Sequence, residues 1–184
     1  DEKAKHIVRE DFLSCLKVSA EQFYNRCSDG VYLLAGYPWF GYRARDQFIA
    51  LPGATLYAGH AKMFDEIMNR GEVALREFMN AERATTRLTE VDVPDVLLWA
   101  VWAIQQYALK MGISVAAERY GNLVYDIINY IRRQQHPNLK VHDNGLLFTN
   151  GKERPATWMN AVENGWPITP RTGYVVEINA LWYN

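Results

Sequence analysis

The chain has 184 residues, of which 49% are hydrophobic and 13% aromatic, and its formal net charge is -1 at pH 7. This is the length of one domain with a substantial core, and the near balance of charge argues against a nucleic-acid-binding surface. The two cysteines, Cys15 and Cys27, and the spacing of the four histidines predict neither a disulfide framework nor a metal site. No segment is long and apolar enough to span a membrane and no signal peptide is evident, so we expect a cytoplasmic protein.

The first part of the chain alternates helices with short connections. Apolar residues at helical spacing predict an amphipathic helix over residues 4–25, to which we assign no chemistry. A turn signal and a short apolar run then predict an extended segment over residues 31–35. Two further helices are expected, one from about Asp46 towards Gly59 and one over residues 62–80, in which Gly71 is a weak point.

The second part of the chain holds the most apolar helix. After a polar loop over residues 82–92, the segment 94–112 is apolar on nearly every face, which is typical of an inner helix surrounded by others. An amphipathic helix is expected over residues 114–135, with Ser114 as its cap, and turn signals within residues 138–155 predict a small hairpin. The alternation of inner and amphipathic helices predicts an all-α fold built of layered helical hairpins.

Two blocks of the sequence combine aromatic and polar residues. The first, AGYPWFGYRARDQFIALPG, sets Arg45 and Asp46 beside an aromatic cluster, although a surface ion pair and an acidic residue at a helix N-terminus would explain them without a ligand. The second, TWMNAVENGWPITPRTGYVVEINALWYN, fills residues 157–184. Aromatic rings stack on sugar faces, and amides, carboxylates and guanidinium groups match sugar hydroxyls. A buried loop packed on a core would have a similar composition.

These two blocks, with DVLLW between them, closely resemble in wording and order the catalytic domain of the glycogen debranching enzymes, the amylo-alpha-1,6-glucosidases. The resemblance implies an (alpha/alpha)6 barrel, an alpha-glucan as ligand, no cofactor or metal, and inverting hydrolysis of an alpha-1,6-linked glucose stub. A barrel of twelve helices needs about twice this length. We therefore expect residues 1–184 to form one partial domain, roughly the first half of the barrel, cut from something longer at both ends.

The resemblance also assigns roles to individual residues. Those expected to contact the sugar are Trp39, Arg45, Asp46, Asp95, Trp99, Trp158, Arg171, Glu177 and Asn179. A helix-capping role explains Asp95 equally well, and Arg171 and Glu177 are equally explained as a structural ion pair. Arg43 and Ala44 depart from the family, which usually has Trp and Gly at these positions, so an extra cation stands where an aromatic contact is expected.

The position of the family's general acid, an Asp, is occupied by Asn160, whose amide cannot supply an acidic proton. Glu163 is the nearest carboxylate that could substitute for it. The base of the reaction is expected downstream, outside this chain. Two hypotheses follow: a glycoside hydrolase fragment that is inactive alone, or a non-catalytic sugar-binding or structural remnant. Because half a barrel leaves inner helices uncovered, we also expect self-association through residues 96–104 and the segment from Leu181 onward.

Overall fold

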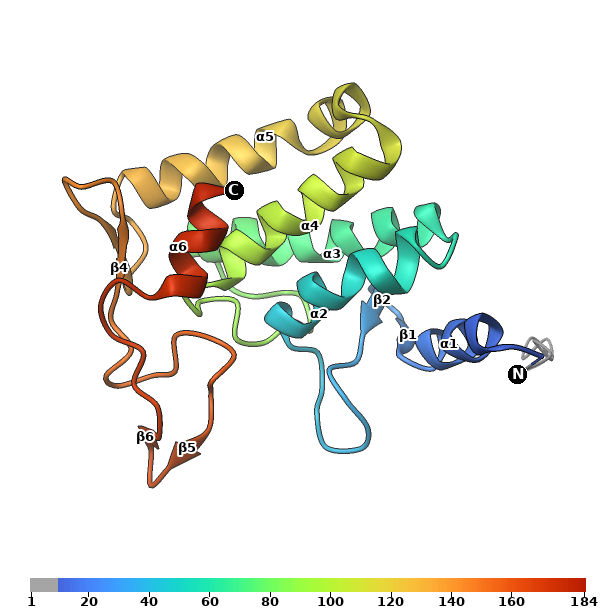
Figure 1. Ribbon diagram of the computed structural model, residues 1–184, viewed down its shortest axis with the longest axis horizontal. Helices are drawn as coiled ribbons and strands as arrows, with labels where there is room; N and C mark the ends of the chain where they lie inside the picture. Colours follow the sequence, from blue (N-terminus) through green and yellow to red (C-terminus); the bar gives the residue numbers. More distant parts are fainter. Residues whose placement is uncertain (1–9) are drawn as a thin grey trace.

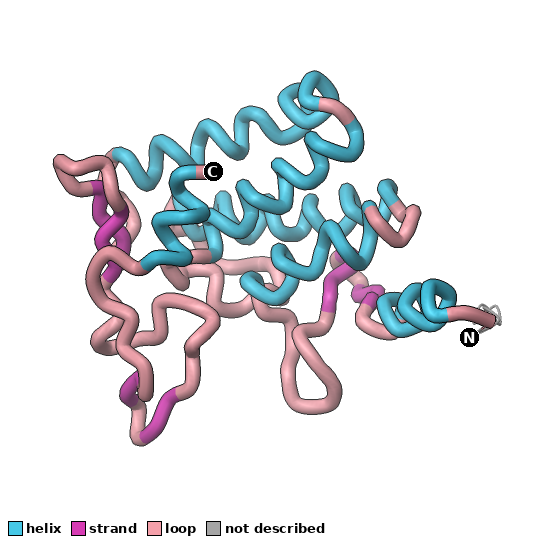
Figure 2. The backbone as a smooth tube through the Cα atoms, viewed as in Figure 1, coloured by secondary structure: helices cyan, strands magenta, loops and turns pink. Residues whose placement is uncertain are grey.

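The computed structural model describes residues 10–184, which form six α-helices and three two-stranded antiparallel hairpins (Figure 1, Figure 2). The helices are α1 (Phe12–Glu21), α2 (Ala44–Leu51), α3 (Ala61–Met79), α4 (Val96–Met111), α5 (Ile113–Arg132) and α6 (Val176–Tyr183), and a π-helical turn, η1 (Pro52–Leu56), extends α2. The strands are β1 (Tyr24–Cys27) with β2 (Gly30–Leu33), β3 (Leu139–Val141) with β4 (Leu147–Thr149), and β5 (Val162–Glu163) with β6 (Trp166–Pro167). The predominantly helical fold is confirmed.

The first helix is shorter than expected and its apolar face is not buried. Residues 4–9 of the expected helix lie outside the described residues. Helix α1 begins after Asp11, whose carboxylate accepts a hydrogen bond of 2.7 Å from the backbone N–H of Ser14. It ends before β1 because residues 24–27 pair with β2 instead. Phe12 and Leu16, on the apolar side of the helix, are exposed.

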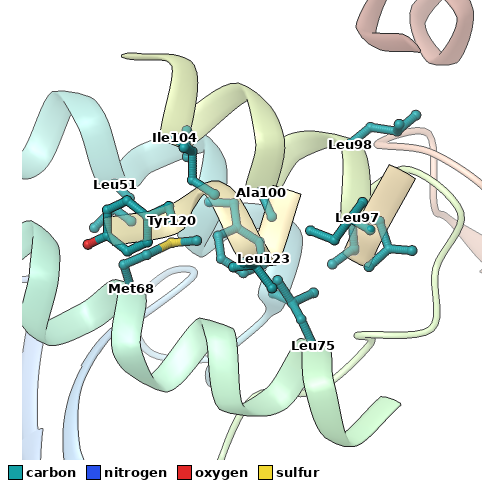
Figure 3. Packing of buried hydrophobic residues seen from close by; sticks show 14 of the residues in the cluster. Leu51, Met68, Leu75, Leu97, Leu98, Ala100, Ile104, Tyr120 and Leu123 are labelled. Carbon is teal, nitrogen blue, oxygen red and sulfur yellow. The ribbon is translucent and has the colours of Figure 1, made fainter. Parts of the chain in front are cut away.

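Helix α4 is the inner helix that its apolar sequence predicts. It packs against α5, α2 and α6, and its side chains Leu97, Ala100 and Ile104 are buried in the main hydrophobic core. Figure 3 shows Met68 and Leu75 of α3 and Tyr120 and Leu123 of α5 converging on the same cluster. Each fully buried side chain of this size contributes about 1.5–3 kcal/mol relative to an exposed one. Apolar residues on several faces of α4 are therefore explained by neighbours on several sides.

Gly71 is a point of close packing between α2 and α3 rather than a weak point. A Cβ atom built on Gly71 would lie 2.7 Å from Cε1 of Phe48, which is closer than carbon atoms can approach. The ring of Phe48 is fully buried against this position. The absence of a side chain at residue 71 thus allows the two helices to meet.

Helix α5 has the buried face that its pattern predicts, but not the predicted cap. Ala116, Tyr120, Leu123, Ile127 and Ile131 are buried along it, whereas Ile128 is half-buried. Gly112 occupies the capping position and no side chain caps the helix, so Ser114 lies inside the first turn. The hairpin expected after α5 is present as β3 and β4.

An apolar groove of about 420 Å³ runs between α4, α5 and α6. Apolar residues lining it include Leu98, Val101, Ile104, Val124, Ile127, Leu181 and Trp182. The expected uncovering of residues 96–104 is therefore restricted to one side of α4, because most of these side chains are buried against α2, α3 and α5.

Candidate functional site

A cavity of about 500 Å³ is formed where three irregular segments meet. The segments are the loop before α2, the stretch that leads into α4, and the long connection that reaches β5. In Figure 1 the loop before α2 and the β5–β6 hairpin both extend below the helices. Arg45 and Asn160, far apart in the sequence, line the same cavity. The complete lining is Phe40, Arg43, Arg45, Glu90, Val93, Arg154, Pro155, Asn160, Ala161 and Val162.

Arg45 is held in the cavity wall by a buried ion pair with Asp95. Its Nε donates to Oδ2 at 2.8 Å and its Nη2 donates to Oδ1 at 3.0 Å. The side chains are only 5% and 2% exposed, so the two charges are almost completely removed from water. A guanidinium group carries five N–H donors, and this arrangement leaves Nη1 uncommitted. Arg45 can therefore keep its position and still donate hydrogen bonds to a ligand.

Asp95 neither caps α4 with its side chain nor lines the cavity. It precedes α4, but its carboxylate makes no capping hydrogen bond and instead also accepts from Nε1 of Trp99 at 3.2 Å. Burial raises the pKa of the Asp95 carboxyl, an effect opposed by the hydrogen bonds from Arg45. The sequence left two roles open for Asp95, and capping of α4 by its side chain is wrong. Its buried position does not favour direct contact with a sugar, and its carboxylate instead holds the guanidinium of Arg45 in place.

The stretch before α4 supplies three acidic residues, and each pairs with an arginine near the cavity. Besides the buried pair, Nε of Arg43 lies 3.5 Å from Oε1 of Glu90, and Arg154 makes a bidentate pair with Asp92. Exposure rises along this series: the side chains of Arg43 and Glu90 are 30% and 32% exposed. Those of Arg154 and Asp92 are 58% and 34% exposed. The three cations beside the cavity are therefore matched by three anions.

Asn160 is a half-buried member of the cavity lining. Its backbone N–H donates to the carbonyl oxygen of Trp158 at 2.9 Å, which folds the loop tightly at this point. Within the described part of the chain, no hydrogen bond engages its side-chain amide. The amide can both donate to and accept from a ligand, but it has no acidic proton to transfer. Asn160 therefore places an amide, and not an acid, in the cavity lining.

Several residues predicted to contact the sugar do not line this cavity. Trp39 and Trp158 are close in sequence to the lining residues Phe40 and Asn160, but they are not part of the lining and are 82% and 63% exposed. Asp46 lies half-buried in the first turn of α2, where its negative charge interacts favourably with the helix dipole. Trp99 packs edge-on against Trp102. Of the residues expected to contact the sugar, Arg45 alone lines this cavity, together with Asn160 at the expected acid position.

Glu163, the substitute proton donor predicted from the sequence, lies on the exposed strand β5. Its neighbours Ala161 and Val162 belong to the cavity lining, but Glu163 does not. The carboxylate that does line the cavity is that of Glu90. From the sequence, residue 90 was expected to lie in a polar loop without a role. The only available signal was the run of acidic residues at positions 90, 92 and 95, which has no distinctive spacing.

The last three predicted residues join neighbouring segments to α6. Arg171 forms an ion pair with Glu177, so the structural alternative for these two residues is realised. The side chain of Asn179 accepts from the backbone N–H of Leu147 at 2.8 Å and donates to its carbonyl oxygen at 3.0 Å. Gly151 packs directly on this loop, since a Cβ atom there would lie 2.4 Å from the carbonyl oxygen of Arg171. These contacts position the segment that carries Asn160.

Within residues 10–184, no three His, Cys, Asp or Glu side chains are grouped so that they could hold a metal ion. Of the helices in the same range, none combines the length and the apolar character needed to cross a bilayer.

The fold and the site together define a helical domain whose loops build a cavity lined by arginine, glutamate and asparagine side chains alongside apolar ones. The family model for amylo-alpha-1,6-glucosidase matches residues 14–184. The chain therefore belongs to the amylo-alpha-1,6-glucosidase family, and it carries a glycoside hydrolase-like domain of the glycogen debranching type. This confirms the resemblance found in the sequence blocks. Comparison with curated proteins and with solved structures gave no match.

Proposed function

We propose that the cavity binds the terminal glucose of an alpha-glucan branch, with Arg45 and Asn160 as hydrogen-bonding groups and Trp39 and Trp158 as flanking aromatic surfaces. The observation that carries the proposal is the convergence of Arg45 and Asn160, from two separate family-like blocks, on one cavity. Its volume of about 500 Å³ lies within the usual range for small-molecule sites.

The charges around the cavity favour a neutral ligand. Each of the three arginines is paired with one acidic residue of the stretch before α4. An anionic ligand would compete with these carboxylates, whereas a sugar can use the donors that remain free without breaking the pairs. A neutral, hydroxyl-rich molecule therefore fits the electrostatics better than a phosphate does.

In the complete enzyme we propose inverting hydrolysis of an alpha-1,6-glucosidic bond, with residues 1–184 forming about half of an (alpha/alpha)6 toroid. Inversion requires a carboxylic acid that protonates the leaving oxygen and a carboxylate that activates water, about 6.5–9.5 Å apart. Asn160 occupies the position of the acid and can donate only a neutral hydrogen bond to the glycosidic oxygen. The base is not assigned to any of these 184 residues. We therefore propose that this chain binds but does not hydrolyse.

Binding can be tested by titrating the ¹⁵N-labelled chain with isomaltose, an alpha-1,6-linked disaccharide, and following the backbone amide signals. The proposal predicts saturable shifts that cluster at residues 43–45 and 160–162. Cellobiose, which is beta-linked, serves as the control and should bind more weakly. The absence of saturable shifts, or shifts confined to other surfaces, would contradict the proposal.

The second candidate is an alpha-glucan-binding protein with no hydrolytic role in any context, and the amide at residue 160 favours it. The two candidates differ in their response to Asn160→Asp in a chain that contains the downstream base. General acid catalysis typically contributes about 10²–10⁴-fold, so a debranching enzyme should gain glucose release from a phosphorylase-limit dextrin by a factor in that range. A non-catalytic binder should gain nothing. In the 184-residue chain neither variant should release glucose.

A further inference from the structure

The cavity wall contains a carboxylate without an assigned role, that of Glu90. We infer that Glu90, held by Arg43, accepts a hydrogen bond from a hydroxyl of the bound sugar and thereby fixes the orientation of the sugar ring. The inference rests on the proposed function, because it concerns the same cavity and the same class of ligand. It adds a specificity-determining residue from a loop in which the sequence indicated none.

Hydrogen-bond complementarity gives the first reason. Three of the polar groups in the wall are guanidinium groups, of Arg43, Arg45 and Arg154, which donate hydrogen bonds and accept none. Every sugar hydroxyl has one proton to donate as well as lone pairs that accept. A wall of donors alone would leave buried hydroxyl protons without partners, at a cost comparable to that of a lost hydrogen bond. Glu90 adds two acceptor oxygens to a wall in which Asn160 offers one more.

The backbone at Glu90 gives the second reason. Glu90 has a φ of +59°, in the left-handed region that side chains other than glycine rarely adopt. The preceding residue is firmly fixed, since Thr89 N–H donates to the carbonyl of Tyr42 at 2.9 Å and its own carbonyl accepts from Ala44 N–H at 3.1 Å. Unfavourable backbone conformations persist where surrounding contacts impose them, and they cluster at ligand sites. Here the hydrogen bonds of Thr89 impose the unusual backbone conformation of Glu90, whose carboxylate is part of the cavity wall.

The geometry of the Arg43–Glu90 pair gives the third reason. Its closest approach, 3.5 Å, is longer than the 2.8 Å between Arg45 and Asp95, and both partners remain about one-third exposed. The guanidinium carbon of Arg43 also lies 4.7 Å from the centre of the Phe40 ring, so Arg43 is held even without a tight bond to Glu90. One carboxylate oxygen can therefore stay near Arg43 while the other accepts from a ligand.

The test compares isomaltose binding by the wild-type chain, Glu90→Gln and Glu163→Gln, measured by NMR titration. Glu90→Gln preserves the shape but removes the charge and one acceptor. We expect its Kd to rise about tenfold or more, the effect of losing a hydrogen bond to a charged group. Glu163→Gln removes an exposed carboxylate near the cavity and should leave the Kd unchanged. Thermal unfolding of each variant verifies that it is folded.

A measurement on the unmodified chain accompanies the variants. On saturation with isomaltose, the ¹³C signal of the Glu90 carboxyl should shift, and that of Glu163 should not. This readout remains decisive if Glu90→Gln fails to fold. If the wild type binds isomaltose while the Glu90 carboxyl signal stays fixed and Glu90→Gln binds normally, the inference is overturned and the proposed function stands. If the wild type does not bind at all, both fail together.

Discussion

Replacing Asp95 by Asn should destabilise the protein strongly, because it would leave the guanidinium of Arg45 buried without its counter-charge. The two side chains are only 5% and 2% exposed and share hydrogen bonds of 2.8 and 3.0 Å. Removing one partner of such a pair typically costs about 3–5 kcal/mol. Since the total free energy of unfolding of a domain is about 5–15 kcal/mol, this loss is a large part of it.

The pair between Arg154 and Asp92 provides a matched control. It also joins a bidentate arginine to an aspartate of the same stretch, but its side chains are 58% and 34% exposed. Exposed ion pairs contribute about 0–1 kcal/mol, so Asp92→Asn should have little effect. Urea unfolding, followed by far-UV circular dichroism, measures both variants. For a chain of this length, each kcal/mol corresponds to roughly 2–4 °C in Tm.

Equal effects of Asp95→Asn and Asp92→Asn would refute the reasoning, because burial would then not decide the strength of these pairs. A further variant separates stability from function. Arg45→Met combined with Asp95→Leu replaces the buried pair by apolar side chains, a change that is often neutral or stabilising. This double variant should remain folded and yet bind isomaltose poorly. Retained binding would show that Arg45 has only a structural role.

Three further predictions concern other parts of the molecule. Burial lowers the pKa of His136 from 6.5 to about 4, so between these pH values the unfolded chain binds a proton that the folded chain does not. The free energy of unfolding should therefore fall by up to about 3 kcal/mol as the pH drops through this window. In urea unfolding at pH 7 and pH 4.5, His136→Asn should reduce this pH dependence. Gly71→Ala should lower the free energy of unfolding by about 1–3 kcal/mol, because the new methyl group would clash with Phe48. If Gly71 only lowered the helix propensity of α3, the same substitution would raise the free energy of unfolding by about 1 kcal/mol. A second copy of the chain should cover the α4–α5–α6 groove, so sedimentation at micromolar concentration should show a dimer that Val101→Glu weakens; a wild-type monomer would contradict this.

The helices could be predicted from local sequence patterns, because a helix satisfies its own backbone hydrogen bonds. Its buried face is visible in the spacing of its apolar residues. The buried face of α5 and the all-round apolar character of α4 were predicted in this way. Periodicity does not reveal whether a partner surface exists, which explains why the apolar side of α1 is exposed rather than buried. The packing of Gly71 on Phe48 also depends on a partner helix.

The candidate site was predicted only where one segment carries the signal. The sequence blocks identified Arg45 and Asn160, and the structure places both in one cavity. The partner of Arg45 is fifty positions away at Asp95, a distance at which no local rule applies. Glu90 was missed for the same reason, since its place in the cavity follows from the bridge between residues 43 and 89. Aromatic composition suggested pocket walls, but it could not show that Trp39 is exposed and absent from the cavity lining.

The most direct test of the proposed function is a crystal structure of this chain in complex with isomaltose. We predict electron density for a glucose ring in the cavity, with a hydroxyl within about 3.2 Å of Nη1 of Arg45 and another within the same distance of the Asn160 amide. A well-occupied sugar on a different surface, with this cavity empty, would contradict it.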